Sequence, residues 1–330
     1  MLFRKKNNKF YKNFIIILFI SLLFLTIMIL FSNKSSCLKI LNNNVYSFFK
    51  INFKCVISKN KTLGERNKFY YHKFDEFNRY HSLYNKKKQS CGINKRIILV
   101  IGQSNAANEI KVYNSIETKS LNYYNGQCYD LTNPVLGATG VKDNIAVPIS
   151  SKINKQNQFI FLTHAWSGTG ILDWGSDKYS YLTSYVKKQL SVMESKGHRL
   201  SYIIWIQGEY DSRNFSKLDK GQGPGFYEKF GKNKYYVKSF NIILKDLFKG
   251  KMNYDNVKVV LTKTSICRNK TSAFITDQQE RIALNNKNIF ITQVTDNLDN
   301  SFRYDGCHLN EEGADKTAEA IAEIINSIEN

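Results

Sequence analysis

The 330-residue chain contains four short polar clusters whose residue types could carry out nucleophilic chemistry. The first, Gly102-Gln103-Ser104-Asn105, directly follows an apolar run over residues 97–101. A serine hydroxyl is a weak nucleophile until a neighbouring base removes its proton. Because a serine in such a turn more often caps a helix, a chemical role for Ser104 depends on a base elsewhere in the chain.

The last cluster, Asp305-Gly306-Cys307-His308-Leu309, contains a candidate base. An Asp-x-x-His spacing in a tight turn lets the carboxylate reach Nδ1 of the imidazole. That contact fixes the tautomer and leaves Nε2 free to accept a proton from a serine. The alternative is a histidine with a structural role only, and this cluster alone does not choose between the two.

The two remaining clusters offer groups that could stabilise an oxyanion. In Ser167-Gly168-Thr169-Gly170-Ile171-Leu172-Asp173-Trp174, the glycines allow backbone N–H groups to approach a reacting carbonyl closely, although a plain turn would look the same. In Trp205-Ile206-Gln207-Gly208-Glu209-Tyr210-Asp211, the glutamine amide is a possible hydrogen-bond donor. The two carboxylates of this cluster have no histidine or third carboxylate nearby in sequence, so no metal site is expected.

The elements around the clusters predict a sheet that would bring them together. Short apolar runs predict strands, and amphipathic stretches predict helices. This alternation is typical of βαβ units and a mainly parallel sheet. The carboxyl ends of parallel strands share one edge, where α/β folds keep their sites. The expected strands are 97–101, 158–163, 201–206, 257–262 and 288–294, and the expected helices are about 178–196, 226–249, 273–286 and 311–328.

In order and spacing, the blocks GQSN, SGTGILDW, WIQGEYD and DGCHL resemble those of SGNH (GDSL-type) hydrolases. They are more closely similar to the sialate O-acetylesterase and carbohydrate acetylesterase branch, including its plant-type members. The resemblance runs from about Arg96 to the C-terminus. It implies a three-layer α/β/α, flavodoxin-like domain with a mainly parallel sheet. It also implies ester hydrolysis through an acyl-enzyme, with no metal and no cofactor.

The resemblance assigns a role to each matching residue. Ser104 would be the nucleophile, His308 the general base and then acid, and Asp305 the partner that orients it. The oxyanion hole would consist of the N–H groups of Ser104 and Gly168 and the side chain of Gln207. Supporting or substrate-binding groups would be Gln103, Asn105, Thr169 and Glu209.

Three positions depart from the family pattern. Ser167 stands where the first glycine of Gly-Gly-Thr is common, and Tyr210 replaces a usually small residue. Asn105 is followed by Ala-Ala where Met-Ala is frequent. None of these departures removes a catalytic group.

The chain has a formal net charge of +21, and the position of that charge bears on its partners. Residues 1–96 contain 20 Lys or Arg and 3 Asp or Glu, whereas the remaining residues contain 28 and 24. A nucleic-acid-binding protein concentrates basic residues on the domain that reads the ligand. No nucleic-acid partner is therefore expected.

The N-terminal region has the pattern of a membrane anchor. Residues 14–31 are uncharged and apolar, close to the ~20 residues needed to span a bilayer. The basic residues before them predict a cytoplasmic N-terminus. We expect a cytoplasmic tail (1–13), a transmembrane signal-anchor (14–31), a basic stalk or N-terminal extension (32–95) and an extracytoplasmic esterase domain (96–330). Cleavage of a signal peptide is the alternative and would give a secreted protein.

The six cysteines show no CxxC pair, so a zinc site is not expected and disulfides are possible outside the cytosol. Their pairing stays open at this stage, as does the use of four glycosylation sequons. The cysteines are Cys37, Cys55, Cys91, Cys128, Cys267 and Cys307, and the sequons begin at Asn33, Asn60, Asn214 and Asn269.

The expected activity is removal of O-acetyl groups from carbohydrates, such as sialic acids or polysaccharides, by a type II membrane protein. One alternative is a general GDSL-type esterase of lipids or small esters. A second is a catalytically idle, membrane-anchored glycan-binding module. The sequence does not indicate an oligomeric state.

Overall fold

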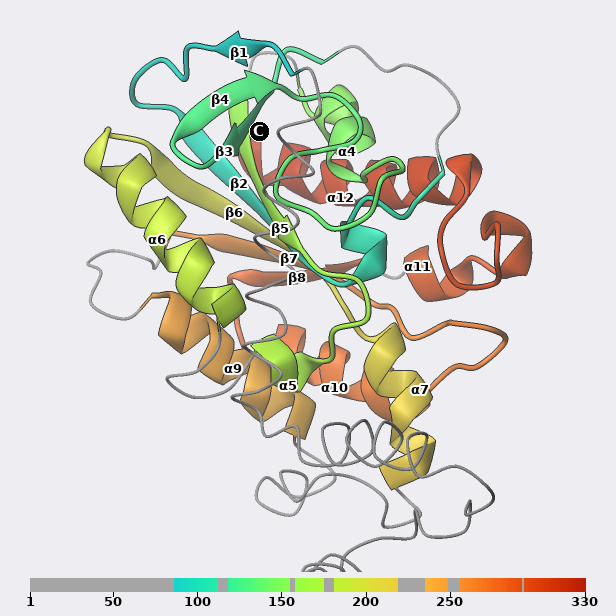
Figure 1. Cartoon of the computed structure of the whole chain (residues 1–330). Helices are drawn as coiled ribbons and strands as arrows, with labels where there is room; N and C mark the ends of the chain where they lie inside the picture. Colours follow the sequence, from blue (N-terminus) through green and yellow to red (C-terminus); the bar gives the residue numbers. More distant parts are fainter. Residues whose placement is uncertain are drawn as a thin grey trace, which may run out of the picture. The chain divides into compact units, whose positions relative to one another are not determined.

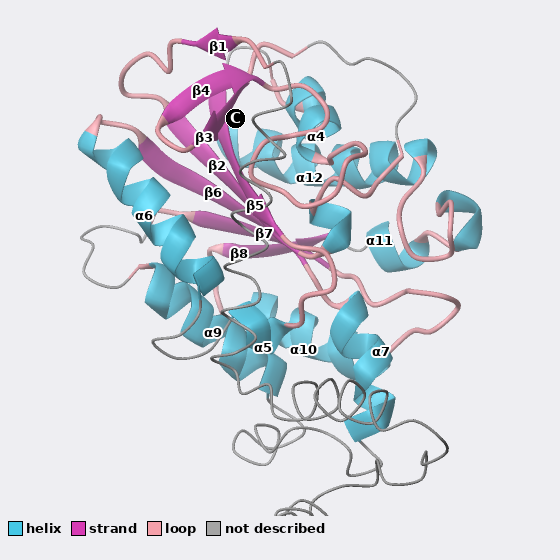
Figure 2. Cartoon of the chain, viewed as in Figure 1, coloured by secondary structure: helices cyan, strands magenta, loops and turns pink. Residues whose placement is uncertain are grey.

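A computed structural model describes residues 86–111, 118–154, 158–174, 181–218, 235–248, 256–292 and 294–330. All of these residues belong to one compact unit. Its centre is an eight-stranded sheet in the order β1-β4-β3-β5-β2-β6-β7-β8 (Figures 1 and 2). The strands are β1 (Lys88–Gln89), β2 (Arg96–Gly102), β3 (Leu121–Tyr124), β4 (Gln127–Asp130), β5 (Phe159–Ala165), β6 (Arg199–Ile206), β7 (Lys258–Thr262) and β8 (Ile289–Thr292).

The sheet is mixed. Strands β3, β5, β2, β6, β7 and β8 run parallel to one another, while β4 pairs antiparallel with both β3 and β1. The helices are α4 (Ala146–Lys152), α5 (Ile171–Trp174), α6 (Tyr181–Ser195), α7 (Glu209–Leu218), α9 (Tyr235–Leu247), α10 (Ala273–Leu284), α11 (Val294–Asn297) and α12 (Glu311–Glu329), with 3-10 turns η2 (Ser104–Ala106) and η4 (Asn300–Phe302).

Strand β2 lies between β5 and β6, and its side chains pack on both faces of the sheet. Ile97, Leu99 and Ile101 belong to the core beneath α5, α6, α9 and α10. The alternate residues Ile98 and Val100 belong to the second core, beneath α4 and α12. This period of two produces three layers, with the sheet between two sets of helices (Figure 1).

The five strands expected from the sequence all appear, as β2, β5, β6, β7 and β8. Helices α6, α9, α10 and α12 lie within the expected helical stretches. The hairpin of β3 and β4 was not expected. Its two-residue turn, Asn125-Gly126, has φ values of 46° and 87°, as the common tight hairpin turn requires.

Part of the expected stalk belongs to the folded unit. Strand β1 pairs with β4, and a disulfide joins Cys91 to Cys128 next to this pairing. No helix in the part of the chain that the structure describes is long and apolar enough to cross a bilayer. The expected cytoplasmic tail (1–13) and transmembrane segment (14–31) lie outside the described residues.

Candidate active site

Ser104 lies at the carboxyl end of β2, in a turn held by neighbouring strands. A side chain at Gly102 is excluded, because a Cβ there would lie 2.0 Å from the carbonyl oxygen of Ile206. The backbone N–H of Gln103 donates to that same oxygen at 2.9 Å. The chain then turns into η2, whose first residue is Ser104, only 6% exposed. The sheet thus fixes the backbone of the serine at its edge.

The loop before α12 positions the histidine through Asp305. Oδ1 of Asp305 accepts the backbone N–H groups of Cys307 and His308 at 3.0 and 2.8 Å, and Oδ2 lies 2.7 Å from Nδ1 of His308. Partial burial alone would raise the pKa of Asp305, but these hydrogen bonds outweigh it and lower the pKa below its usual value. An ionised carboxylate therefore holds a proton on Nδ1 and leaves Nε2 as the acceptor.

Asn105 connects the serine turn to the histidine loop. Its Oδ1 accepts the N–H of Leu309 at 3.0 Å, and its Nδ2 donates to Cys307 O and to Oε1 of Glu209, the latter at 2.7 Å. Asn105 is fully buried, so these bonds have no competition from bulk water. This side chain couples the position of Ser104 to that of His308.

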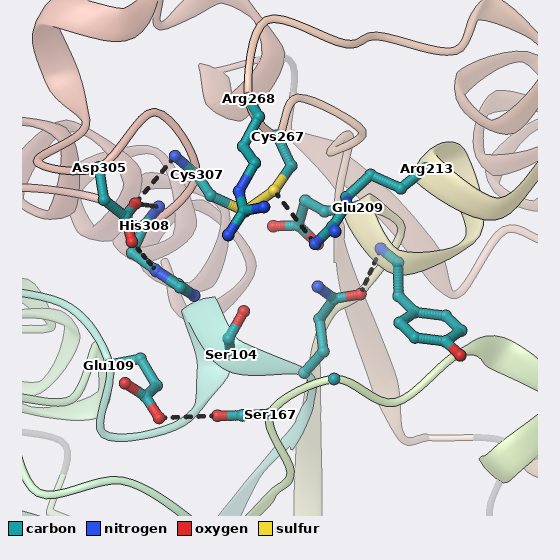
Figure 3. A pocket seen from close by; sticks show the side chains of 13 residues that line it. Ser104, Glu109, Ser167, Glu209, Arg213, Cys267, Arg268, Asp305, Cys307 and His308 are labelled. Atoms are coloured by element: carbon teal, nitrogen blue, oxygen red, sulfur yellow. Dashed lines mark hydrogen bonds and ion pairs between the residues drawn. A yellow bond between two sulfur atoms is a disulfide. The ribbon is translucent and has the colours of Figure 1, made fainter. Parts of the chain in front are cut away.

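Ser104 and His308 line one cavity of about 240 Å³, and both side chains point into it (Figure 3). Among the described residues no hydrogen bond joins the Ser104 hydroxyl to His308, a contact that often tightens only when substrate binds. Most of the lining residues have polar side chains: Gln103, Ser104, Glu109, Ser167, Gly168, Glu209, Tyr210, Arg213, Cys267, Arg268, Asp305, Cys307 and His308.

Two backbone amides are available to an oxyanion in this cavity. Gly168 lines it with a φ of +75°, and no atom lies within 4 Å of the place where a Cβ would stand. Its N–H has no acceptor among the described residues. The N–H of Ser104 begins a helical turn and so has no acceptor within that turn. Both groups fit the roles that the resemblance implies for them.

The structure does not bring every expected residue to the cavity. Gln103 and Glu209 line it, but Asn105, Gln207 and Thr169 do not. Gln207 is completely buried, and its Nε2 donates to Asp211, Gln103 and the carbonyl of Thr169. The hydroxyl of Thr169 donates to Trp166 O and accepts from Trp174 Nε1. These two residues support the site from below its surface.

The residues that depart from the family pattern are accommodated locally. Ser167 donates to Oε1 of Glu109 at 3.1 Å (Figure 3), while its neighbour Gly168 takes the left-handed backbone conformation. Tyr210 lines the cavity and passes close to Gly170, where an added Cβ would lie 2.8 Å from the ring. The glycine therefore makes room for the larger side chain.

Several lining residues were not singled out from the sequence. A disulfide joins Cys267 to Cys307, the residue directly before His308. The next residue, Arg268, has a φ of +54° and donates its N–H to Gly306 O at 2.7 Å. Its guanidinium points into the cavity (Figure 3) and makes no hydrogen bond or ion pair with a described residue. The loop after β7 is thus fastened to the histidine loop and presents a cation to the cavity.

No group of three or more His, Cys, Asp or Glu side chains that could hold a metal ion is found among the described residues. Oε1 of Glu209 accepts a hydrogen bond from Asn105, and Oε2 has no hydrogen-bond partner within the described part of the chain. Because Glu209 is completely buried, this carboxylate supports the wall of the cavity from behind its surface.

The buried carboxyl group of Asp211 should make the stability of the protein depend on pH, independently of catalysis. Complete burial raises its pKa to about 7, despite opposing hydrogen bonds from Gln207, Ile171 N and Tyr235. The unfolded carboxyl titrates near ~3.9, so between these values the folded protein binds more protons, and stability falls as pH rises from about 4 to 7. Asp211→Asn should therefore flatten the decline in Tm between about pH 4 and 7. Equal slopes for variant and parent in thermal melts would contradict this account.

No family model and no curated protein matches the chain. Solved structures do match its fold. Protein AT4G34215 from Arabidopsis thaliana superposes with a TM-score of 0.54 at 15% identity, covering 72% of this chain and 99% of that one. The lipase Lip_vut3 from a goat rumen metagenome has a TM-score of 0.42 at 10% identity, covering 71% and 97%. The carbohydrate acetylesterase XAC1771 from Xanthomonas citri has a TM-score of 0.41 at 10% identity, covering 71% and 56%. The likeness to the Arabidopsis protein shows a shared α/β fold.

Proposed function

We propose that this protein is a serine esterase of the SGNH type that removes O-acetyl groups from carbohydrates. The observation that carries the proposal is the convergence of Ser104 and the Asp305–His308 pair on one cavity. The resemblance of the four sequence blocks to the acetylesterase branch supports the choice of ester.

In the first half of the reaction, the Ser104 hydroxyl oxygen attacks the acetyl carbonyl carbon and passes its proton to Nε2 of His308. The carbonyl electron pair moves onto the oxygen, where the N–H groups of Ser104 and Gly168 stabilise it. As this intermediate collapses, the bond between the acetyl carbon and the sugar oxygen breaks. The sugar oxygen takes the proton from His308, and the acetyl group remains on Ser104.

In the second half, water attacks the acetyl carbonyl and gives a proton to His308. The bond from the acetyl carbon to the serine oxygen then breaks, and that oxygen recovers the proton while acetate leaves. Asp305 keeps the imidazole in the tautomer that both halves need.

A short acyl group and a polar alcohol fit the cavity better than a lipid. Its volume of about 240 Å³ lies below the roughly 300–1,000 Å³ of sites that enclose drug-sized ligands. Its lining offers carboxylates, hydroxyls and guanidinium groups, whereas a long acyl chain needs a continuous apolar surface. Acetate release should be measured on acetylated sialic acids and acetylated xylan, with acetyl and octanoyl p-nitrophenyl esters compared. A preference for octanoyl would favour the general lipid esterase instead.

Arg268 favours a sugar that carries a carboxylate. Its guanidinium faces the cavity and has no partner among the described residues, and guanidinium groups pair well with carboxylates. Because the side chain is exposed, we expect Arg268→Gln to lower kcat/KM on an O-acetylated sialic acid about five- to tenfold. The effect on p-nitrophenyl acetate should be smaller.

The matched control is Arg199→Gln, which makes the same change in charge at the first residue of β6, outside the cavity. It should leave the ratio of activities on acidic and neutral substrates as it is in the parent. If Arg268→Gln lowered kcat/KM on the O-acetylated sialic acid and on p-nitrophenyl acetate by the same factor, the acidic-sugar assignment would be contradicted.

We also propose that residues 14–31 anchor the protein in a membrane with the esterase domain outside the cytosol, facing an O-acetylated glycan. The disulfides Cys91–Cys128 and Cys267–Cys307 support an oxidising compartment. Protection of the esterase domain from added protease in sealed membrane vesicles tests this orientation. Cleavage of the domain in intact, cytosol-side-out vesicles would contradict it.

A further inference from the structure

His308 approaches Ser104 from one face of the sheet. The next residue, Leu309, packs in the core beneath α4 and α12, and its carbonyl oxygen accepts the N–H of Lys111 at 3.1 Å. In Figure 3, His308 and Arg213 of α7 lie on opposite sides of Ser104. Because His308 gives its proton to the oxygen of the departing sugar, the sugar must lie on the His308 side of the serine.

The oxygen and the methyl group of the acetyl carbonyl must therefore point away from His308. The N–H of Gly168, in the loop after β5, faces the oxygen. Strand β2 lies between β5 and β6, so the space at the end of β6 is left for the methyl group. Helix α7 begins there, and Tyr210 in its first turn lines the cavity.

The ring of Tyr210 is held in place on this side of the cavity. The backbone N–H of Tyr210 donates to Oε1 of Gln103 at 3.0 Å. An added Cβ at Gly170 would lie 2.8 Å from Cδ1 and 3.1 Å from Cε1 of the ring, so the ring packs closely against the glycine backbone. Oδ2 of Asp211 accepts the N–H of Ile171 at 2.9 Å and ties α7 to the start of α5. The ring therefore has little room to withdraw toward Gly170.

We propose that the Tyr210 ring limits the acyl group of the substrate to acetyl by closing the cavity at the end of β6. This inference rests on the proposed esterase function and names the residue that sets the length of the acyl group. The side chain is half-buried, so its removal would open the cavity in the direction of the acyl chain. One methylene group that fits or fails to fit changes specificity about 10- to 200-fold.

The test compares kcat/KM on p-nitrophenyl acetate, butanoate and hexanoate. The parent should prefer acetate to butanoate by about tenfold or more. Tyr210→Ala and Tyr210→Ser remove the ring and should raise the ratio of butanoate to acetate activity about 10- to 200-fold. The matched control is Tyr210→Phe, which keeps the ring, so its ratio should stay within about threefold of the parent value.

A ratio that is unchanged in folded Tyr210→Ala and Tyr210→Ser overturns the inference. A rise in KM for acetylated sugars at an unchanged ratio also overturns it, because the ring would then contact the sugar and not the acyl group. If thermal melts show that both variants are unfolded, Tyr210→Leu supplies the same comparison with an apolar side chain that lacks the outer part of the ring.

Failure of the inference can be told apart from failure of the proposed function. Ester hydrolysis that is lost in Ser104→Ala, together with an unchanged ratio in the Tyr210 variants, overturns only the role of Tyr210. Hydrolysis that survives Ser104→Ala overturns the proposed function itself, and the role of Tyr210 with it.

Discussion

Ser104→Ala should lower kcat/KM on acetyl esters by about 10⁴-fold or more, the loss expected when a catalytic serine is removed. The change deletes one oxygen and adds none, at a position where the backbone is fixed by Gly102, Gln103 and Ile206. Folding should therefore be unaffected, and Tm should stay close to that of the parent. Steady-state hydrolysis of p-nitrophenyl acetate, with a thermal melt of each protein, measures both expectations.

Ser167→Ala is the matched control for this prediction. Ser167 lies in the same cavity, but its hydroxyl donates to the carboxylate of Glu109 and not to an imidazole. Its removal should cost far less activity than removal of the Ser104 hydroxyl. If Ser167→Ala abolished hydrolysis and Ser104→Ala did not, the assignment of the nucleophile would be wrong.

Asp305→Asn should lower kcat by about 10³- to 10⁴-fold while the loop keeps its shape. The amide oxygen of the variant can still accept the N–H groups of Cys307 and His308, which Oδ1 now accepts. The amide nitrogen, however, would face Nδ1 of His308 as a donor. The imidazole would then carry its proton on Nε2, where it cannot take one from Ser104.

The control for this change is Asp315→Asn, which neutralises an exposed carboxylate on α12 outside the cavity. It should leave kcat close to the parent value. A folded Asp305→Asn variant with kcat within about tenfold of the parent would show that the carboxylate does not set the tautomer.

The central strands could be predicted because burial on both faces leaves a strong pattern. Strands β2, β5 and β6 are continuous apolar runs, which only a covered parallel sheet accommodates. Strand β1 has two residues and its pairing lies beside the Cys91–Cys128 disulfide, so no local pattern marks it. The hairpin of β3 and β4 did have a signal, the Asn125-Gly126 dipeptide between two short strands.

The sequence predicted that Ser104, Asp305 and His308 would lie at one site, as they do, but it did not predict the contacts that support them. Strand order brings the ends of β2 and β6 together, but Gln103 and Gln207 follow these strands in equivalent positions. Which amide faces the cavity depends on the donors around each one, and the sequence does not display those contacts. The position of Arg268 at the cavity depends on the Cys267–Cys307 disulfide and on its own left-handed backbone conformation. The sequence left the cysteine pairing open, so this position could not be predicted.

The most direct test of the esterase account is to trap the acetyl-enzyme. The parent protein should be mixed with p-nitrophenyl acetate, quenched in acid within milliseconds and digested for peptide mass spectrometry. The account predicts an acetyl group on the peptide that contains Ser104, formed before steady-state turnover and absent from Ser104→Ala. Acetate release without that adduct, or a kinetically competent adduct on another residue, would contradict it.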